Sequence, residues 1–282
     1  MNQPPESSSR PPLSPRPEAS PPQWRRPRGV APGTWDYVHQ RSIADHYDAF
    51  VADTPLCHVD AEILANRLPG VATDHAEVIL DLGCGSGRSA LPLAGRGYRV
   101  AAVDLSLPML QLLTKKASQA ALIARVHPVH ANLVELSCFA ENSADHAICL
   151  FSTLGMIQGR ANRRDMLRHV GRIVRPGGSF MLHVHNRWAA LRERHGIQAL
   201  MGSFWRSLRD ANCEFGDATY AYRGLDNMFM HRFSRPELLR DLKESGWSID
   251  TLCRISIDGS RIDQKTKIPG GFLVVATLAG AS

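Results

Sequence analysis

Short apolar runs alternate along the chain with segments of helical spacing. Most of the runs are rich in Val, Ile, Leu and Ala without polar alternation, which is typical of strands buried on both faces of a parallel sheet. Two further runs near the C-terminus are joined by a Gly- and Pro-containing connection, which allows an antiparallel hairpin. The seven predicted strands are residues 77–82, 98–103, 126–130, 146–151, 179–185, 247–255 and 272–278.

Helical segments precede the first strand and separate most of the others. The predicted helices lie within residues 34–68 and at 89–96, 106–118, 160–175 and 234–245. Ser106 occupies a capping position, and Ser234 with Glu237 has the spacing of a capping box. The turn at residues 175–178 leads into the fifth strand. The pattern predicts an α/β fold: a seven-stranded, mostly parallel sheet with helices on both faces and an antiparallel C-terminal hairpin.

Two regions depart from this alternation. Residues 1–33 hold ten of the eighteen prolines and five arginines, a composition that predicts a disordered Pro/Arg-rich tail before one domain over residues 34–282. Residues 186–230 lack a strong period but follow a strand's carboxyl end, so we interpret them as a lid or substrate insertion rather than helices that only thicken the core. Tyr47 and Arg41 are further candidates to close over a ligand. The aromatic residues of the insertion include Trp188, Phe204, Trp205, Phe215, Tyr220 and Tyr222.

Charge and cysteine usage exclude several classes of protein. Of the net charge of +6, residues 1–30 contribute +3, and the remaining balance is ordinary for a soluble enzyme. The six cysteines are scattered without a C-x-x-C pair, so neither a metal site nor a disulfide framework is expected. No apolar run approaches the length of a membrane span and no secretory signal is visible, so we predict a cytoplasmic protein.

A glycine-rich turn after the first strand carries the main chemical signal. Gly83, Gly85 and Gly87 alternate there, and Asp104 ends the second strand. Glycines let backbone approach a ligand, and a carboxylate at this position accepts hydrogen bonds from ribose hydroxyls. The spacing is G-x-G-x-G, and Arg88 stands where a G-x-G-x-x-G dinucleotide motif would have its third glycine. The site is therefore predicted for a nucleotide-like ligand other than a dinucleotide.

Three motifs of the chain resemble motifs of the class I S-adenosylmethionine-dependent methyltransferases and occur in the same order as in that family. The family is a broad group that includes quinone-biosynthesis and small-molecule methylases. The three motifs are Leu80–Gly87, Val103–Ser106 and Arg175–Gly178, and the resemblance covers about residues 36–280. It implies a Rossmann-like sheet and S-adenosylmethionine as the cofactor. The residues that it assigns to the cofactor are Asp81, Gly83, Gly85, Gly87, Asp104, Leu105, Asn132 and Leu133.

The resemblance also implies a role for each of these positions. The glycine backbone would lie against the methionine part, Asp81 would hold its amino group, and Asp104 would bind the ribose diol. Leu105 would pack on the adenine. Asn132, where the family usually has aspartate, would accept from the adenine amino group. The alternatives are that Asp81 only orients the turn and that Asn132 is a cap.

The implied reaction is in-line methyl displacement, in which the enzyme mainly aligns the reactants and excludes water. His183 and His185 share one face of the fifth strand. His185, at its end, is a candidate base, with packing as the alternative. We consider three functions: methylation of a small molecule, methylation of RNA such as tRNA through the arginines of residues 1–33 and 160–175, and a non-catalytic cofactor-binding module.

Overall fold

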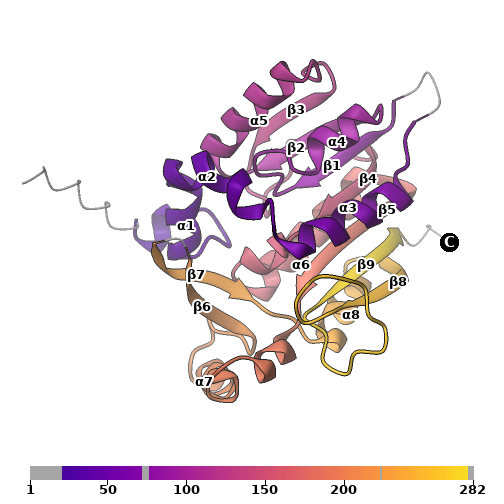
Figure 1. Cartoon of the computed structure of the whole chain (residues 1–282). Coiled ribbons are helices and arrows are strands. Elements are labelled where there is room, and N and C mark those ends of the chain that lie inside the picture. The colour runs from indigo at the N-terminus through magenta and orange to yellow at the C-terminus, as the bar shows by residue number, and fades with distance from the viewer. Residues whose placement is uncertain (1–20, 72–75, 223, 279–282) are drawn as a thin grey trace, which may run out of the picture.

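The computed structural model describes residues 21–71, 76–222 and 224–278, and its central element is a seven-stranded sheet (Figure 1). The strand order is β3-β2-β1-β4-β5-β9-β8. The first five strands run parallel, and β9 pairs antiparallel with both β5 and β8. This confirms the predicted sheet and its C-terminal hairpin. The strands are β1 (Val78–Leu82), β2 (Arg99–Asp104), β3 (Val126–His130), β4 (Ala144–Cys149), β5 (Val174–His185), β8 (Trp247–Ile255) and β9 (Gly271–Leu278).

Helices cover both faces because the buried strands present apolar side chains to both. In β5, Phe180 and Leu182 belong to one core cluster and Met181 to the other. One face is covered by α6 (Arg160–Ile173) and α8 (Arg235–Glu244). The opposite face is covered by α3 (Pro55–Arg67), α4 (Ala90–Gly95) and α5 (Leu107–Gln119).

The remaining elements gather beside the carboxyl ends of the parallel strands. A two-stranded antiparallel sheet pairs β6 (Asp217–Tyr222) with β7 (Leu225–His231). Gly33 of α1 approaches β7 so closely that a Cβ there would lie 1.8 Å from the Asn227 carbonyl oxygen. The other elements are η1 (Gln23–Arg25), α1 (Pro32–His39), α2 (Arg41–Val51), η2 (Thr153–Met156), η3 (Arg187–Arg192) and α7 (Gly196–Arg209).

The predicted tail boundary at residue 34 is wrong, because residues 21–33 already pack on the domain. Val30 is buried and forms a β-bridge with Ile157. The Arg28 guanidinium lies 2.7 Å from Asp165 of α6. These long-range contacts offset the cost of ordering a proline-rich segment. Residues 1–20, the rest of the predicted tail, lie outside the described residues.

Three local predictions have different outcomes. The Ser234–Glu237 capping box at the start of α8 is confirmed in both directions. Ser106 stands at the N-cap of α5, but its hydroxyl donates to the Val38 carbonyl at 2.7 Å instead of accepting from the helix. The turn predicted at residues 175–178 is part of β5, which begins at Val174 with a register shift against β4.

Candidate active site

A cavity of about 290 Å3 lies at the carboxyl edge of the parallel strands. Parallel strands present their loops at the same edge, so the segments following β1 to β5 all contribute to its wall. α1, α2, β6 and β7 supply the cover. The volume is at the lower end of the ~300–1,000 Å3 typical of small-molecule sites. Of the predicted site residues, Asp81, Gly83, Gly85, Asp104, Leu105, Asn132, Leu133 and His185 line this cavity.

The glycine turn after β1 brings backbone to the cavity wall. Gly83 and Gly85 have φ angles of +74° and +54°, which side chains rarely allow. A Cβ on Gly83 would lie 2.4 Å from the Thr153 methyl group, so this glycine also lets η2 approach. A Cβ on Gly85 would lie 3.6 Å from the ring of Tyr47, which therefore lies against the turn.

Asp104 is held in a fixed orientation at the end of β2. One carboxylate oxygen accepts from the Gly85 N–H and the other from the Ser106 N–H, both at 2.8 Å. Burial raises the pKa of this carboxyl above its ordinary value, and the backbone donors oppose the rise. Each oxygen retains a further lone pair. The carboxylate can therefore accept from two adjacent hydroxyls in the cavity.

Asp81 is a buried carboxylate with an unused oxygen. Its side chain is only 3% exposed, and its Oδ2 has no hydrogen-bond partner among the described residues. Burial raises the pKa of Asp81 to about 7, and the nearby Arg88 only partly opposes this. Arg88 itself pairs with Asp60 at 2.9 Å. A cationic ligand group with N–H donors, such as the amino group of an amino acid, fits this unpaired oxygen.

Asn132 lines the cavity but is already engaged by the protein. Its side-chain carbonyl accepts from the Val134 N–H at 3.2 Å, and its amide donates to the Arg28 carbonyl at 3.0 Å. These bonds are those of a capping residue that also fastens the segment before α1. The carbonyl keeps one lone pair for a ligand, while Leu105 and Leu133 supply apolar wall on neighbouring loops.

Gly87 lies outside the cavity wall, in contrast to the prediction for it. Its φ is +92°, and a Cβ there would lie 2.3 Å from Leu113 Cδ1 of α5. Its N–H donates to the Cys84 carbonyl at 3.0 Å. The third glycine of the motif is therefore required for the turn and for helix packing rather than for contact with a ligand.

His185 faces the cavity from the end of β5, and its backbone N–H donates to the Ser152 hydroxyl at 3.1 Å. Burial lowers the pKa of His185 to about 4, so its imidazole is neutral near pH 7. His183 is fully buried and does not line the cavity. A second cavity of about 280 Å3 also reaches His185 and carries Arg192, Glu193 and Arg232.

The cover of the cavity only partly follows the sequence interpretation. Tyr220 and Tyr222 line the cavity, but Arg41 is exposed and away from it. The remaining aromatic residues of the insertion form a separate cluster, in which Phe204 and Phe215 ring centroids are 5.6 Å apart. Further residues of the cavity wall were not identified individually from the sequence; they include Gly29, Val30, Tyr37, Met109, Phe151, Met156, Met228 and Met230. The i, i+2 spacing of Met228 and Met230 is nevertheless typical of a strand.

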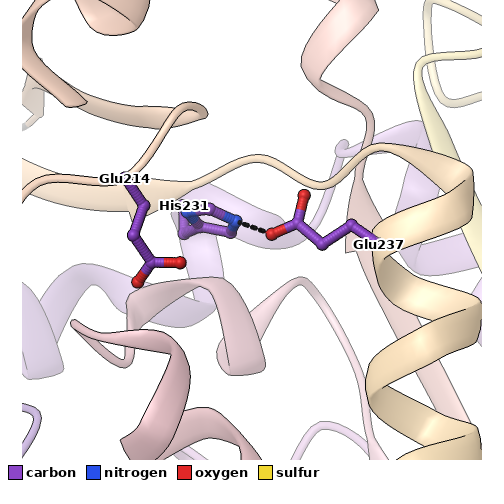
Figure 2. Close-up of side chains that lie close together, drawn as sticks. All are labelled: Glu214, His231 and Glu237. Atoms are coloured by element: carbon purple, nitrogen blue, oxygen red, sulfur yellow. Dashed lines mark hydrogen bonds and ion pairs between the residues drawn. The ribbon is translucent and has the colours of Figure 1, made fainter. Parts of the chain in front are cut away.

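Glu214, His231 and Glu237 form the one cluster with metal-like spacing in the described residues, their ligand atoms lying within 4.8 Å (Figure 2). His231 contacts Glu237 at 2.8 Å and Asp217 at 2.6 Å. Glu214 is paired with Arg163 and Glu237 with Arg187. Because two guanidinium groups already occupy the carboxylates, we interpret the cluster as an ion-pair network that fastens β6 and β7 to α8.

Comparison with known proteins shows that part of the chain is similar to methyltransferases. Residues 79–178 match the family model described as a methyltransferase domain. The chain is 35% identical over 104 residues to the cypemycin N-terminal methyltransferase of a Streptomyces species, covering 37% of this chain and 40% of that protein. It is 28% identical over 181 residues to the tRNA 5-carboxymethoxyuridine methyltransferase of Escherichia coli strain K12, covering 61% and 59%.

A solved structure extends the likeness to most of the chain. The 1,6-didemethyltoxoflavin-N1-methyltransferase of Burkholderia thailandensis, with 1,6-didemethyltoxoflavin and S-adenosylhomocysteine bound, superposes with a TM-score of 0.57 at 20% identity. The match covers 89% of this chain and 91% of that one. Residues 79–178 thus match a methyltransferase domain, and the chain has a Rossmann-like fold, as the motifs predicted. The chain spans less than two thirds of the length of the two curated relatives.

Across the described part of the chain, no helix has the length and apolar character needed to cross a membrane.

Proposed function

We propose that the protein is an S-adenosylmethionine-dependent methyltransferase that acts on a small molecule. The observation that carries this proposal is the juxtaposition of Asp81, the Gly83–Gly85 backbone and Asp104 around one cavity. The unpaired, buried carboxylate of Asp81 matches the amino group of the cofactor, and the Gly83–Gly85 backbone matches its methionine part. The fixed carboxylate of Asp104 matches the ribose diol.

The residues of this chain would bind and orient more than they would perform chemistry. When bound, the cofactor supplies a methyl group on a sulfonium, which is already a strong electrophile. Asp81 and Asp104 would hold its two ends, and the cover formed by Tyr47, Tyr222 and Met230 would exclude water. His185, neutral near pH 7, would accept a proton from an acceptor that requires deprotonation.

The cover of the cavity favours a small acceptor over a polymer. Tyrosine and methionine side chains from α1, α2, β6 and β7 line the cavity together with the glycine turn, and a largely apolar wall of this kind suits a small molecule. Next to His185, the second cavity carries Arg192 and Arg232 against the single acid Glu193. This excess of positive charge favours an acceptor that bears a carboxylate or phosphate group.

RNA is the second candidate acceptor, because one relative is named as a tRNA methyltransferase and matches 61% of the chain. The arginines of α6, however, are largely used within the protein. Arg163 is buried against Glu214, and Arg160 and Arg164 both pair with Asp241. Paired arginines offer little charge to a phosphate backbone, so this candidate has less support from the structure than the small-molecule one.

The first experiment is calorimetric titration with S-adenosylmethionine. Asp104→Ala removes the acceptor for two hydroxyls, and hydrogen bonds to a charged group of this kind justify a loss of about 100-fold in affinity. Asp53→Ala, at an exposed carboxylate, is the matched control and retains wild-type affinity. Thermal unfolding of both variants verifies the fold. Unchanged affinity in Asp104→Ala, or no binding by wild type, would contradict the proposal.

A second experiment separates the acceptors. Transfer of a labelled methyl group is measured to a metabolite extract and, separately, to unmodified RNA. Label in an acidic metabolite fraction supports the proposed acceptor class. Label in RNA that falls steeply with salt supports the second candidate. Cofactor binding without transfer to either pool supports the non-catalytic module.

A further inference from the structure

Helix α7 is oriented with its polar side inward. Gly196 and Ser203 are its buried positions, and a Cβ on Gly196 would lie 1.6 Å from the Ala190 carbonyl. The Ser203 hydroxyl donates to the Asp217 carbonyl at 3.1 Å and accepts from the Gly216 N–H at 3.0 Å. α7 is thus fastened to the start of β6 by small and polar contacts instead of by an apolar face.

The opposite arrangement holds on the exposed side. Five large apolar side chains follow the i, i+4, i+7, i+8, i+11 pattern that normally turns toward a core. Two more, on η3, extend the same region. We name as the α7 patch the residues Trp188, Leu191, Ile197, Met201, Phe204, Trp205 and Leu208, which are 42–62% exposed.

The patch is continuous rather than a scatter of single residues. Phe215 links its two parts, because its ring lies 6.0 Å from Trp188 and 5.6 Å from Phe204, measured between ring centroids. Phe204 in turn lies 5.9 Å from Trp205. Isolated exposed apolar residues need no explanation, but a joined aromatic and aliphatic surface of this kind marks an interaction site.

Positive charge borders the α7 patch. Arg192, Arg194, Arg206 and Arg209 are all exposed, and the Arg209 guanidinium lies 6.0 Å from the Trp205 ring centroid. The acidic residues beside these arginines are Glu193, with which Arg232 pairs at 2.6 Å, and the exposed Asp210, so the four exposed arginines outnumber them. The surface therefore combines an apolar centre with a basic rim.

This combination decides between the possible occupants. A second copy of the chain, paired through the same patch, would bring two basic rims together. An anionic lipid surface instead receives the apolar side chains at the headgroup boundary and attracts the arginines. We propose that the α7 patch docks the protein on the surface of a membrane that contains anionic lipids.

Docking in this way would place the substrate cover beside the bilayer. α7 lies at the outer side of the β6–β7 pair (Figure 1), and Ser203 connects it directly to β6. Tyr220 and Tyr222 of the same strand line the cavity. The docking surface and the cavity are therefore on one substructure, although the docking proposal does not depend on the reaction that the cavity catalyses.

The test is flotation of the full chain with vesicles of phosphatidylcholine alone and with vesicles that also contain phosphatidylglycerol. Ile197→Ser/Leu208→Ser removes two of the most exposed side chains of the patch, and Ile123→Ser, at a distant residue that is 46% exposed, is the control. We expect wild type and Ile123→Ser to bind the anionic vesicles, and the double variant to bind at least about tenfold less. Arg206→Gln/Arg209→Gln should lose binding by a comparable factor, with a weaker salt dependence than wild type.

Three results would overturn the proposal. The first is no flotation of wild type with anionic vesicles. The second is equal flotation of wild type and the Ile197→Ser/Leu208→Ser variant. The third is self-association of wild type in light scattering that the double variant abolishes, together with no vesicle binding, because this would assign the patch to a second copy of the chain. Thermal unfolding of each variant confirms that lost binding is not lost folding.

Discussion

Replacing Asp81 with asparagine should make the protein more stable and its cofactor site weaker. The Asp81 carboxyl is buried with one oxygen unpartnered, and its pKa is raised from 3.8 to about 7. A carboxyl whose pKa is higher in the folded than in the unfolded state binds more protons when folded. The free energy of unfolding therefore falls as pH rises from about 4 to about 7, and above that range the folded protein carries the full cost of the buried charge.

The magnitude follows from the pKa. The change from 3.8 to about 7 corresponds to about 4 kcal/mol, at about 1.4 kcal/mol per pH unit. Asparagine has the shape of the neutral acid, so Asp81→Asn should recover part of this cost at pH 8 and little of it at pH 4. A cationic ligand requires the ionised form, of which only about a tenth is present at pH 6. Wild-type affinity for S-adenosylmethionine should thus rise about tenfold from pH 6 to pH 8.

Urea unfolding at pH 4 and pH 8 measures the stability difference, and calorimetric titration at pH 6 and pH 8 measures the affinity. Asp81→Asn should bind more weakly at pH 8 and lose the pH dependence, while Asp53→Asn, at an exposed carboxylate, should behave as wild type. If Asp81 only orients the turn after β1, the asparagine variant would be less stable and its affinity would change little. That result would refute the reasoning from the unpaired oxygen.

Three other substitutions test separate features. Gly87→Ala places a methyl group 2.3 Å from Leu113 Cδ1 at a backbone φ of +92°. The substitution should therefore lower the free energy of unfolding by about 1–3 kcal/mol. A variant as stable as wild type would argue against the packing role of Gly87. Burial raises the pKa of Glu237, but its hydrogen bond with His231 and the charges of His231 and Arg187 outweigh burial and lower the pKa from 4.5 to about 2. Glu237→Gln should therefore cost about 3 kcal/mol in urea unfolding at pH 7, and this difference should shrink as pH falls from 4.5 toward 2. A structurally idle glutamate would show neither effect. His185→Asn should slow methyl transfer but leave the cofactor affinity measured by calorimetry unchanged. The wild-type rate should decline near pH 4, where the imidazole is protonated. If the His185→Asn variant transferred methyl groups at the wild-type rate, His185 would be excluded as the base.

The main sheet was predictable because its strands are locally unambiguous. The run from Val78 to Leu82 is apolar enough to be buried on both faces, and the C-terminal runs 247–255 and 272–278 are both confirmed as antiparallel strands. The insertion was not predictable as two strands and a helix. α7 carries its apolar residues outward, so the usual assumption that an apolar stripe faces the core gives the wrong orientation.

Site residues were predictable where a motif has a local geometric reason. Gly83 and Gly85 require positive φ, and Asp104 ends a strand beside them, so sequence order alone brings these groups together. The same argument failed for Gly87, because the approach of Leu113 depends on the packing of α5 and has no sequence signature. Val30 was missed for a related reason, since composition indicates disorder when a segment's partner, here Ile157, is distant in sequence.

The cover of the cavity is built from contacts that are distant in sequence. In this cover, residues near the start of the chain contact residues near position 225. Gly33 fits against Asn227 only because glycine has no Cβ, and the rings of Tyr37 and Tyr222 lie 6.1 Å apart. Neither contact belongs to a motif, whereas the cofactor-facing turn is one continuous stretch. The glycine turn can therefore stay unchanged while the paired segments above it change. Exchanging residues in α1 and β7 together should alter the acceptor, whereas exchanging either alone should disrupt the cover.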